Sequence, residues 1–291
     1  MRTQTRSPSR PTLTAANRRR IGDVIATIAA ALIGILFLVP FAWMIVNSLK
    51  SLPEIYEFPP RFLPATPLWS NYADAWNALP FGRFFGNSLI VSLASTVGVL
   101  ITCSLAGYSF ARLHYRGRDQ IFLIYLATIM IPFPVLMVPL FVIMKNLQLV
   151  DTLWALILPA IFSPAGTFLM RQFILTLPRE LEEAARVDGC SFFGIYWRIV
   201  LPLMKPVIAT LGIFTFLGSW NEFLWPLITI NSIDNKTLPL GITMFQSRLS
   251  GRTPWHEVMA SATFAIIPVL ILFVIGQKYY VRGIVTTGIK G

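Results

Sequence analysis

The sequence is poor in charged residues and in cysteine. Asp, Glu, Lys and Arg make up only 13% of its 291 residues, whereas they make up about 25% of a typical soluble domain. Two cysteines, Cys103 and Cys190, are too few to build a disulfide scaffold. With 55% hydrophobic residues the chain is also unlike a disordered protein, which is polar and rich in charge. These shortages favour an integral membrane protein.

The sequence contains several long runs without a charged residue. A helix needs about 20 mostly apolar residues to cross the hydrocarbon core of a bilayer. Five runs of suitable length carry no charge, and a sixth carries only Glu222. We therefore expect an all-α integral membrane protein, with a basic tail over residues 1–23 and a six-span domain over residues 24–291. The predicted transmembrane helices lie at about 24–48, 85–110, 121–144, 153–170, 206–231 and 258–277.

The net charge of +11 is explained by topology. Of the 24 Lys and Arg residues, 17 lie in the two terminal tails and in the second and fourth loops, and the other 7 lie in the remaining loops. Membrane proteins concentrate Lys and Arg on the cytoplasmic side. The split predicts a multi-pass protein of the cell membrane with both termini in the cytoplasm. Contact of the basic tail with lipid headgroups accounts for its charge better than nucleic-acid binding does.

Three prolines, Pro132, Pro134 and Pro139, interrupt the third predicted span. Proline removes a backbone donor and kinks a helix. Such a break is tolerated where neighbouring helices or a cavity satisfy the freed carbonyl groups. Two interpretations therefore stay open: a kinked structural helix, or a helix that lines a pathway and rearranges.

The cytoplasmic loop over residues 171–205, between spans 4 and 5, is unusually long and charged. Pro178 and the acidic residues after it favour a helix start, and Gly189 favours a helix end. Within that helix, the spacing of Glu182 and Arg186 predicts an ion pair. A second, aromatic segment follows and ends at Pro202. We expect two short helices whose apolar patch docks onto lipid headgroups or, more favourably, into a groove of another protein.

The same loop carries a family resemblance. Glu183-Ala184-Ala185, then Gly189 after three residues, then Ile199-Val200-Leu201-Pro202 after nine more, is similar to the EAA loop, EAA-x3-G-x9-I-x-L-P, of permeases of binding-protein-dependent ABC importers. The resemblance implies that this loop is the coupling helix that sits in a cleft of the ATPase subunit. The residues it assigns to ATPase coupling are Glu183, Ala184, Ala185, Asp188, Gly189, Ile199, Leu201 and Pro202.

Two further segments extend the resemblance. Residues 220–227, WNEFLWPL, look like the fifth-span signature of carbohydrate-importer permeases of the maltose type, and residues 288–291 resemble the C-terminal tail of the smaller of their two permeases. The resemblance implies a second permease subunit, two ATPase subunits that bind ATP and Mg, and an extracytoplasmic solute-binding protein. It also implies that Gly241, Gln246 and Gly251 in the fifth connection touch the binding protein, although a plain surface loop is the alternative.

The chemistry of an enzyme is missing from the sequence. A phosphate-binding loop needs Lys and then Ser or Thr directly after its second glycine. Gly283 and Gly288 have the right spacing, but Ile289 follows, so ATP hydrolysis is expected in a separate chain and no cofactor is expected in this one. By the predicted topology, His114 and His256 lie on opposite sides of the membrane and cannot share a metal or a catalytic triad.

One ionisable residue lies well inside a predicted span. Glu222 has Trp220 and Asn221 beside it. An intramembrane carboxylate is costly, faces the bundle interior and is a candidate functional residue. Aromatic, amide and carboxylate groups suit the hydroxyls and apolar faces of a sugar, so these three residues are candidates for the translocation pathway. A hydrogen bond that fixes neighbouring helices is the structural alternative.

The sequence thus favours a permease subunit that moves a di- or oligosaccharide, or a sugar-like solute, inward by alternating access. An importer permease for glycerol phosphate or a related polyol phosphate is the nearest alternative. A self-sufficient secondary transporter belongs to another class, and the single intramembrane charge argues against it. A membrane-embedded enzyme would need clustered His, Asp or Glu at one membrane face, and the one acidic cluster belongs to the coupling loop.

Overall fold

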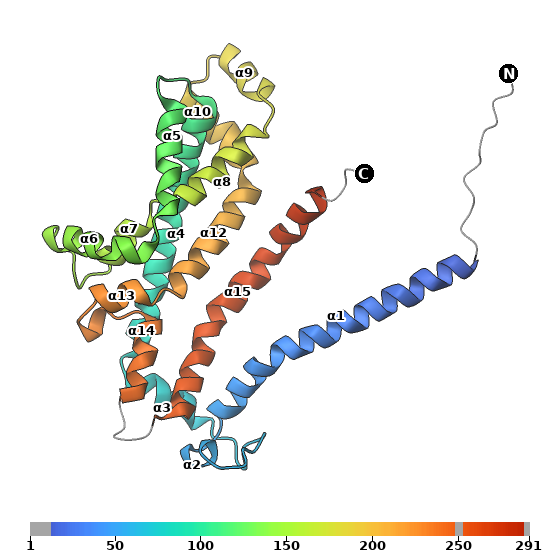
Figure 1. The fold of residues 1–291 in the computed structure, drawn as a ribbon, viewed down its shortest axis with the longest axis vertical. Coiled ribbons are helices and arrows are strands. Elements are labelled where there is room, and N and C mark those ends of the chain that lie inside the picture. The colour runs from blue at the N-terminus through green and yellow to red at the C-terminus, as the bar shows by residue number, and fades with distance from the viewer. Residues whose placement is uncertain (1–12, 248–252, 288–291) are drawn as a thin grey trace.

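The computed structural model describes residues 13–247 and 253–287, and every regular element in these two stretches is helical (Figure 1). The first part of the chain forms α1 (Leu13–Ser48), α2 (Leu52–Ile55), α3 (Ser70–Ala78), α4 (Phe81–Arg112), α5 (Arg118–Ala127), η1 (Thr128–Met130), α6 (Phe133–Asn146), α7 (Trp154–Ala160) and α8 (Pro164–Leu175). The remainder forms α9 (Glu180–Val187), α10 (Phe192–Ile195), η2 (Tyr196–Val200), α11 (Leu201–Leu203), α12 (Lys205–Trp220), α13 (Leu224–Thr229), η3 (Ile233–Asn235), α14 (Leu238–Thr243), η4 (Met244–Ser247) and α15 (Trp255–Thr287).

Several helices in the described stretches are long and apolar enough to cross a membrane. Four of them qualify singly: Arg20–Ser48, Phe81–Arg112, Trp154–Leu175 and Trp255–Gln277. Two bent pairs qualify only when each pair is taken as one span: Arg118–Met130 with Phe133–Asn146, and Phe192–Leu203 with Lys205–Trp220. The chain is therefore an all-α protein with four to six candidate spans, and six remains the prediction from the sequence.

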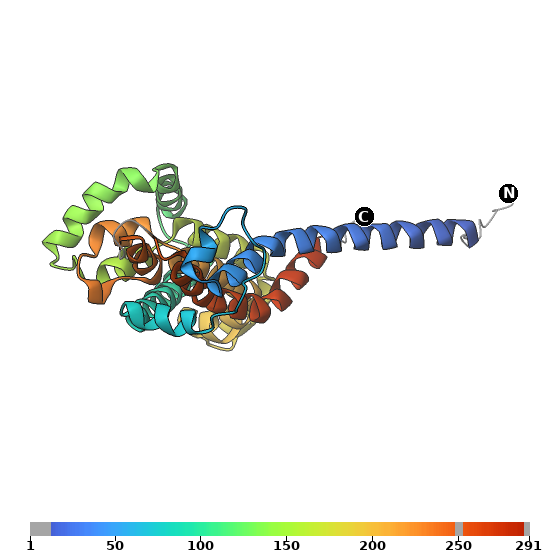
Figure 2. The same ribbon diagram turned by 90° about the horizontal axis from the view of Figure 1, so that it is seen from below.

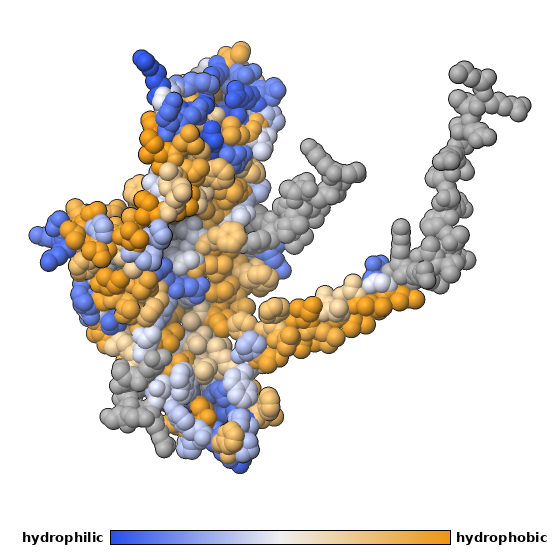
Figure 3. Space-filling view, viewed as in Figure 1, coloured by the Kyte–Doolittle hydropathy of each residue, from blue (hydrophilic) through white to orange (hydrophobic). Residues whose placement is uncertain are grey.

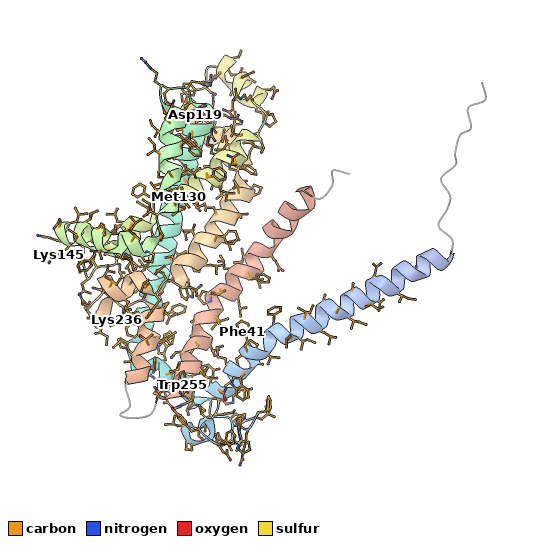
Figure 4. The ribbon with its side chains drawn as sticks, viewed as in Figure 1. Phe41, Asp119, Met130, Lys145, Lys236 and Trp255 are labelled. Atoms are coloured by element: carbon orange, nitrogen blue, oxygen red, sulfur yellow. The ribbon has the colours of Figure 1, made fainter. Side chains whose placement is uncertain are left out.

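The third predicted span, 121–144, is not one continuous helix. Its two halves meet at an angle of 105°. Figure 4 shows the break: α5 runs along the bundle from Asp119 to Met130, and α6 then leaves it sideways toward Lys145. The cause lies in the prolines, because a residue before proline is pushed out of helical geometry. Ile131, which precedes Pro132, is extended with ψ 114°. The predicted kink is thus a right-angled corner.

The fifth predicted span, 206–231, is also shorter than expected. Helix α12 ends at Trp220, and after three residues a new helix, α13, begins at Leu224. The 16 residues of α12 extend about 24 Å, less than the hydrocarbon core of about 30 Å. The Glu222 carboxylate accepts hydrogen bonds from the backbone N–H groups of Leu224 and Trp225, at 3.1 and 3.2 Å. The one charge in this run therefore starts a second helix.

Helix α4 is the central element of the bundle, and α8 and α12 pack along it. Gly107 permits the approach of α8, because a Cβ atom there would lie 2.7 Å from Met170 Cβ and 3.0 Å from Arg171 N. Small residues allow such close packing of membrane helices. Residues of α4 take part in all three buried hydrophobic clusters of the described chain. Helix α4 therefore positions α8, α12, α7 and α14 directly, whereas α15 packs on α12, α3 and α1.

Helix α1 extends away from the bundle, and Figure 2 shows most of its length without a neighbour. None of its membrane-spanning window is buried within this chain. Figure 3 shows apolar residues along the side of α1 that faces the viewer, while the α9 end of the bundle is largely hydrophilic. A helix without a polar face suits lipid or another membrane chain as its surroundings.

The α3 end of the molecule holds α1 through a buried lysine. Lys50 is 2% exposed, and its Nζ donates to the backbone oxygen of Arg61 at 2.6 Å and lies 4.7 Å from the centre of the Trp43 ring. Burial lowers the pKa of Lys50. The Asn71 amide donates to the backbone oxygens of Ser48 and Lys50, at 2.8 and 2.9 Å. The end of α1 is thereby joined to α3.

We predict that Gly107→Ala destabilises the protein by about 1–3 kcal/mol, because the added methyl group overpacks the α4–α8 contact. Gly86→Ala on the same helix is the matched control, since a Cβ there meets nothing within 4 Å and alanine is the better helix former. Thermal unfolding in detergent would compare the two variants. Equal melting temperatures would contradict the close packing of α4 on α8.

Candidate functional site

The first candidate site is the segment from α9 to α11, at one end of the bundle (Figure 1). Three acidic residues occupy the first turn of α9, where they complement the helix dipole. Gly189 follows with φ 81°, and the Cys190 N–H donates to the backbone oxygen of Ala185 at 2.9 Å. The predicted glycine corner is confirmed. Ser191 then caps α10 by accepting a hydrogen bond from the Gly194 N–H at 3.2 Å.

A buried ion pair attaches α9 to the bundle. Arg112, the last residue of α4, places its Nε 2.6 Å from Glu182 Oε1, and the two side chains are 4% and 9% exposed. The same guanidinium donates to the backbone oxygen of Leu177 at 2.7 Å, just before α9. The spacing of Glu182 and Arg186 predicted an ion pair between them, but Glu182 pairs with Arg112 instead. Arg186 instead lies 4.4 Å from the centre of the Phe192 ring on α10.

Two further polar contacts continue along the same face of α4. The Tyr108 hydroxyl donates to the backbone oxygen of Phe192 at 3.4 Å, and Ser104 Oγ lies 2.8 Å from the Tyr196 hydroxyl. Residues 104, 108 and 112 are four apart, so they line one face of a helix. This row, which we call the α4 ladder, fixes α9, α10 and η2 to a single rigid helix.

The predicted coupling residues divide between two sides of this segment. Glu183, Ala184, Asp188, Gly189 and Pro202 are exposed. Ala185 is buried, and Ile199 and Leu201 pack against the same hydrophobic cluster. Large apolar side chains also face outward: Leu181, Val187, Phe192, Phe193 and Trp197 are between 46% and 89% exposed. The segment therefore has an inner side that holds it to α4 and an outer apolar side that the described residues leave uncovered.

The second candidate site is a cavity of about 210 Å³ beside the break between α12 and α13. Helix α4 forms one wall, and α7 and the start of α6 form others. The lining residues are Val91, Ser95, Phe133, Leu156, Pro159, Ala160, Thr215, Gly218, Ser219, Glu222, Trp225, Pro226 and Thr237. Glu222 is the one of the three predicted pathway residues that lines this cavity.

Trp220 and Asn221 lie elsewhere. Trp220 is 2% exposed, its Nε1 donates to the backbone oxygen of Ala265 at 3.0 Å, and its ring stacks on Phe216. It therefore joins α12 to α15, which is the structural alternative considered above. The Asn221 amide donates to the backbone oxygen of Leu217 at 2.8 Å within its own helix. Neither residue is among those that line the cavity.

The hydroxyl groups of the cavity were not identified from the sequence. Ser95 and Thr237 are 0% and 4% exposed, and neither hydroxyl has a hydrogen-bond partner in the described chain. Ser95 belongs to a buried row on α4 with Ser88 and Ser92. Three serines at helical spacing within an apolar span were a detectable signal, since they place hydroxyls on one face. Thr237 follows α13 in a loop, and no sequence pattern connects it to α4.

Asp151 holds the segment that carries Thr237. Its carboxylate accepts hydrogen bonds from the backbone N–H groups of Asn231 and Ser232, both at 2.9 Å. Burial opposes ionisation of Asp151, but these hydrogen bonds outweigh it and keep its pKa below the usual value. In addition, Ser88 Oγ accepts from the Leu238 N–H at 2.7 Å. The cavity wall is therefore fixed from both sides of Thr237.

The predicted contact residues for a binding protein are placed only in part. Gly241 on α14 is buried against the Phe84 ring, where even a Cβ atom would clash, so it does not face outward. This expectation was wrong because α14 packs on α4. The backbone of Gln246 belongs to η4. Gly251, like the tail at residues 288–291, lies outside the described residues.

Known proteins are similar to this chain in sequence and in fold. The family model of binding-protein-dependent transport system inner membrane components matches residues 98–286. The chain is 38% identical to the arabinooligosaccharides transport system permease protein AraQ of Halalkalibacterium halodurans, over 92% of this chain and 96% of that protein. It is 33% identical to the sn-glycerol-3-phosphate transport system permease protein UgpE of Yersinia pestis, over 92% of this chain and 98% of that protein. It is 36% identical to the sulfoquinovosyl glycerol transport system permease protein SmoH of Agrobacterium fabrum, over 93% and 95%.

A solved structure has the same fold. It is a bacterial ABC transporter involved in the import of the acidic polysaccharide alginate, and the TM-score is 0.80. The match covers 95% of this chain and 100% of the other, at 22% sequence identity. Its agreement over nearly the whole length extends the similarity to α1, which the family model does not reach.

We predict that Arg112→Gln releases α9 from the bundle. Removing one partner of a buried ion pair costs about 3–5 kcal/mol, because the remaining Glu182 carboxylate is then buried and unpaired. Limited trypsin digestion should cut at Arg179 and Arg186 faster than in the unmodified protein. The double variant Arg112→Glu with Glu182→Arg should restore part of the protection.

The control for this prediction is Asp119→Asn. Asp119 pairs with Arg118 at 3.0 Å, but its side chain is 62% exposed, so we expect no measurable change in digestion. Unchanged digestion of Arg112→Gln would show that the ion pair does not hold α9.

Proposed function

The chain belongs to the family of binding-protein-dependent transport system inner membrane components, and from this premise we propose how it contributes to an importer. It is a permease and so a transport component rather than an enzyme. We assign it to one half of a pair of permeases that moves a sugar or sugar-like solute inward by alternating access. A second permease, two ATPase subunits that bind ATP and Mg, and a solute-binding protein outside the membrane complete the importer.

The names of the relatives support two classes of solute for this chain. AraQ is named for arabinooligosaccharides, which supports a di- or oligosaccharide for this chain. The match to UgpE, named for sn-glycerol-3-phosphate, supports the alternative of a polyol phosphate. The identities of 38% and 33% are close, so they do not separate the two classes.

The observation that carries the proposal is the uncovered outer side of the α9–α11 segment. Five large apolar side chains there are exposed at an end of the molecule that Figure 3 shows to be hydrophilic. An apolar patch with charged rims marks a docking surface. The segment also carries the acidic residues Glu180 and Glu183, which anionic lipid would repel. A groove in a protein partner therefore suits it better, and we assign that groove to the ATPase subunit.

Coupling requires that a movement of α9 is transmitted to the translocation pathway. The Arg112–Glu182 ion pair connects α9 to the end of α4, and Ser95 on the same helix lines the cavity. Phe84, near the other end of α4, packs against Gly241 of α14. A single helix of 32 residues thus contacts the docking segment, the cavity and the far end of the molecule. Closure of the ATPase pair would move these three regions together, as alternating access requires.

The orientation follows from this assignment and from the charge count. An ATPase is cytoplasmic, so the α9 end lies in the cytoplasm and the α2–α3 end outside. Helix α15 begins at the α3 end and runs toward the α9 end (Figure 1), as a cytoplasmic C-terminus demands. The excess of Lys and Arg in the tails and in the second and fourth loops supports the same orientation.

We predict that affinity purification of the tagged chain from its native membrane, in mild detergent, brings down a second permease and an ATPase with a phosphate-binding loop. Mass spectrometry would identify both at near-stoichiometric amounts. A secondary transporter would be purified without an ATPase, and that result would overturn the proposed function.

We also predict that Glu183→Arg and Gly189→Pro uncouple the importer while leaving the protein in the membrane. Gly189 has φ 81°, which proline cannot adopt, and Glu183 is exposed on the docking side. Solute-stimulated ATPase activity of the reconstituted complex should fall at least tenfold. Glu57→Arg, a charge reversal at the opposite end of the molecule, should retain stimulation. Normal stimulation in the two α9 variants would refute docking through this segment.

A further inference from the structure

We propose that the cavity between α4, α7 and the α12–α13 break is a binding subsite for a neutral, hydroxyl-rich part of the solute, and that Glu222 makes it reject anionic solutes. This inference rests on the proposed import function and chooses between its two solute classes. The residues of this cavity would then determine whether the importer accepts a neutral sugar or a polyol phosphate.

The first observation is a shortage of hydrogen-bond partners. Buried hydroxyl groups in proteins are nearly always paired, so each unpaired one calls for an explanation. The hydroxyls of Ser95 and Thr237 are buried, line the cavity and have no partner in the described chain. They come from α4 and from the loop after α13, and Thr215 and Ser219 of α12 add two further hydroxyls. Four hydroxyls around one cavity can each donate to and accept from a polyol.

The second observation is the charge of the cavity. Glu222 is the single ionisable residue among those that line it, and no Lys or Arg is among them. Protein sites for phosphate or carboxylate use Arg, Lys or free N–H groups at a helix start. The N–H groups of Leu224 and Trp225, which begin α13, are already bound to the Glu222 carboxylate. The cavity therefore carries a carboxyl group and offers an anion no cationic side chain.

The third observation is the shape of the walls. Phe133, Leu156, Pro159 and Trp225 add apolar surface to the cavity that the hydroxyls line. The Trp225 ring is held in place, because its Nε1 donates to the backbone oxygen of Ala155 at 2.9 Å. Phe133 meets this ring edge-on, with 6.0 Å between the centroids. Apolar walls with a few placed polar groups are typical of small-molecule sites, and a neutral sugar has both kinds of surface.

The charge of the cavity can be tested before the solute is known. Ser219→Cys places a thiol in the cavity wall, in a chain whose own cysteines are replaced by Cys103→Ala and Cys190→Ser. The complete importer complex in detergent is treated with two methanethiosulfonate reagents of similar size, one with a trimethylammonium group and one with a sulfonate group. Each rate is divided by the rate of that reagent with free cysteine. Thr210→Cys, on α12 but outside the cavity lining, is the positional control.

We expect the cationic reagent to modify Ser219→Cys at least about tenfold faster than the anionic one, since a nearby carboxylate attracts one and repels the other. Adding Glu222→Gln should bring the ratio close to that of Thr210→Cys. Glutamine still offers an oxygen to Leu224 and Trp225, so it preserves the cap of α13. Equal rates for the two reagents would overturn the proposed selectivity. No reaction with either reagent, in a complex that assembles, would show that the cavity is outside the pathway.

Uptake into vesicles tests the solute class itself. Complexes supplied with their binding protein are given a neutral arabinooligosaccharide or sn-glycerol-3-phosphate. We expect uptake of the neutral sugar. The bound sugar should also protect the Ser219→Cys thiol from the methanethiosulfonate reagents, and Ser95→Ala and Thr237→Val should each weaken this protection by about three- to tenfold. Thr210→Val, whose hydroxyl bonds to Pro206 of its own helix at 3.0 Å, is the matched control. Preferred uptake of the phosphate by the unmodified complex would overturn the inference and leave the importer function standing. Absence of an ATPase partner would instead remove the proposed function.

Discussion

The buried ion pair between Arg112 and Glu182 is the contact on which the functional interpretation depends. It joins the last residue of α4 to α9, and both side chains are more than nine-tenths buried. Desolvating two charges is costly, and such a pair is weak evidence for stability in itself. It does, however, fix geometry, since neither charge can remain buried without the other. The coupling that we propose for α9 needs such a fixed connection to a membrane helix.

Helix α4 connects three regions that lie far apart along its length. At one end the α4 ladder holds the α9–α11 segment, and in the middle Ser95 lines the cavity. Toward the other end Phe84 packs on Gly241. Because protein interiors are densely packed, a displacement at one end of such a helix is not absorbed locally. The same close packing explains why Gly107 has no room for a side chain and why Gly241 is unavailable to an external partner.

The two helix breaks have different physical causes and different consequences. At residues 131–133 the prolines prevent continuation of the helix, and α6 leaves the bundle at 105°. At residues 221–223 a carboxylate starts a new helix, which leaves a cavity beside the break. Irregular backbone at membrane depth is tolerated where protein or a water-filled cavity surrounds it. Phe133 and Trp225 each lie at the start of the helix that follows one of the breaks, their rings contact each other, and both line the cavity, so the two irregularities form one site.

The sequence by itself determined the class, the family and the local corners of this protein. Charge-free runs indicated a membrane protein, the spacing around Glu183 and Gly189 indicated an importer permease, and the match to the family confirmed it. Gly189 could be assigned because a positive φ is a property of a single residue. The partner of Glu182, the burial of Trp220 and the meeting of Ser95 with Thr237 were decided only by tertiary structure. These features bring together residues 45 to 142 positions apart in the chain, and helix packing, unlike helix formation, leaves no local pattern by which to find them.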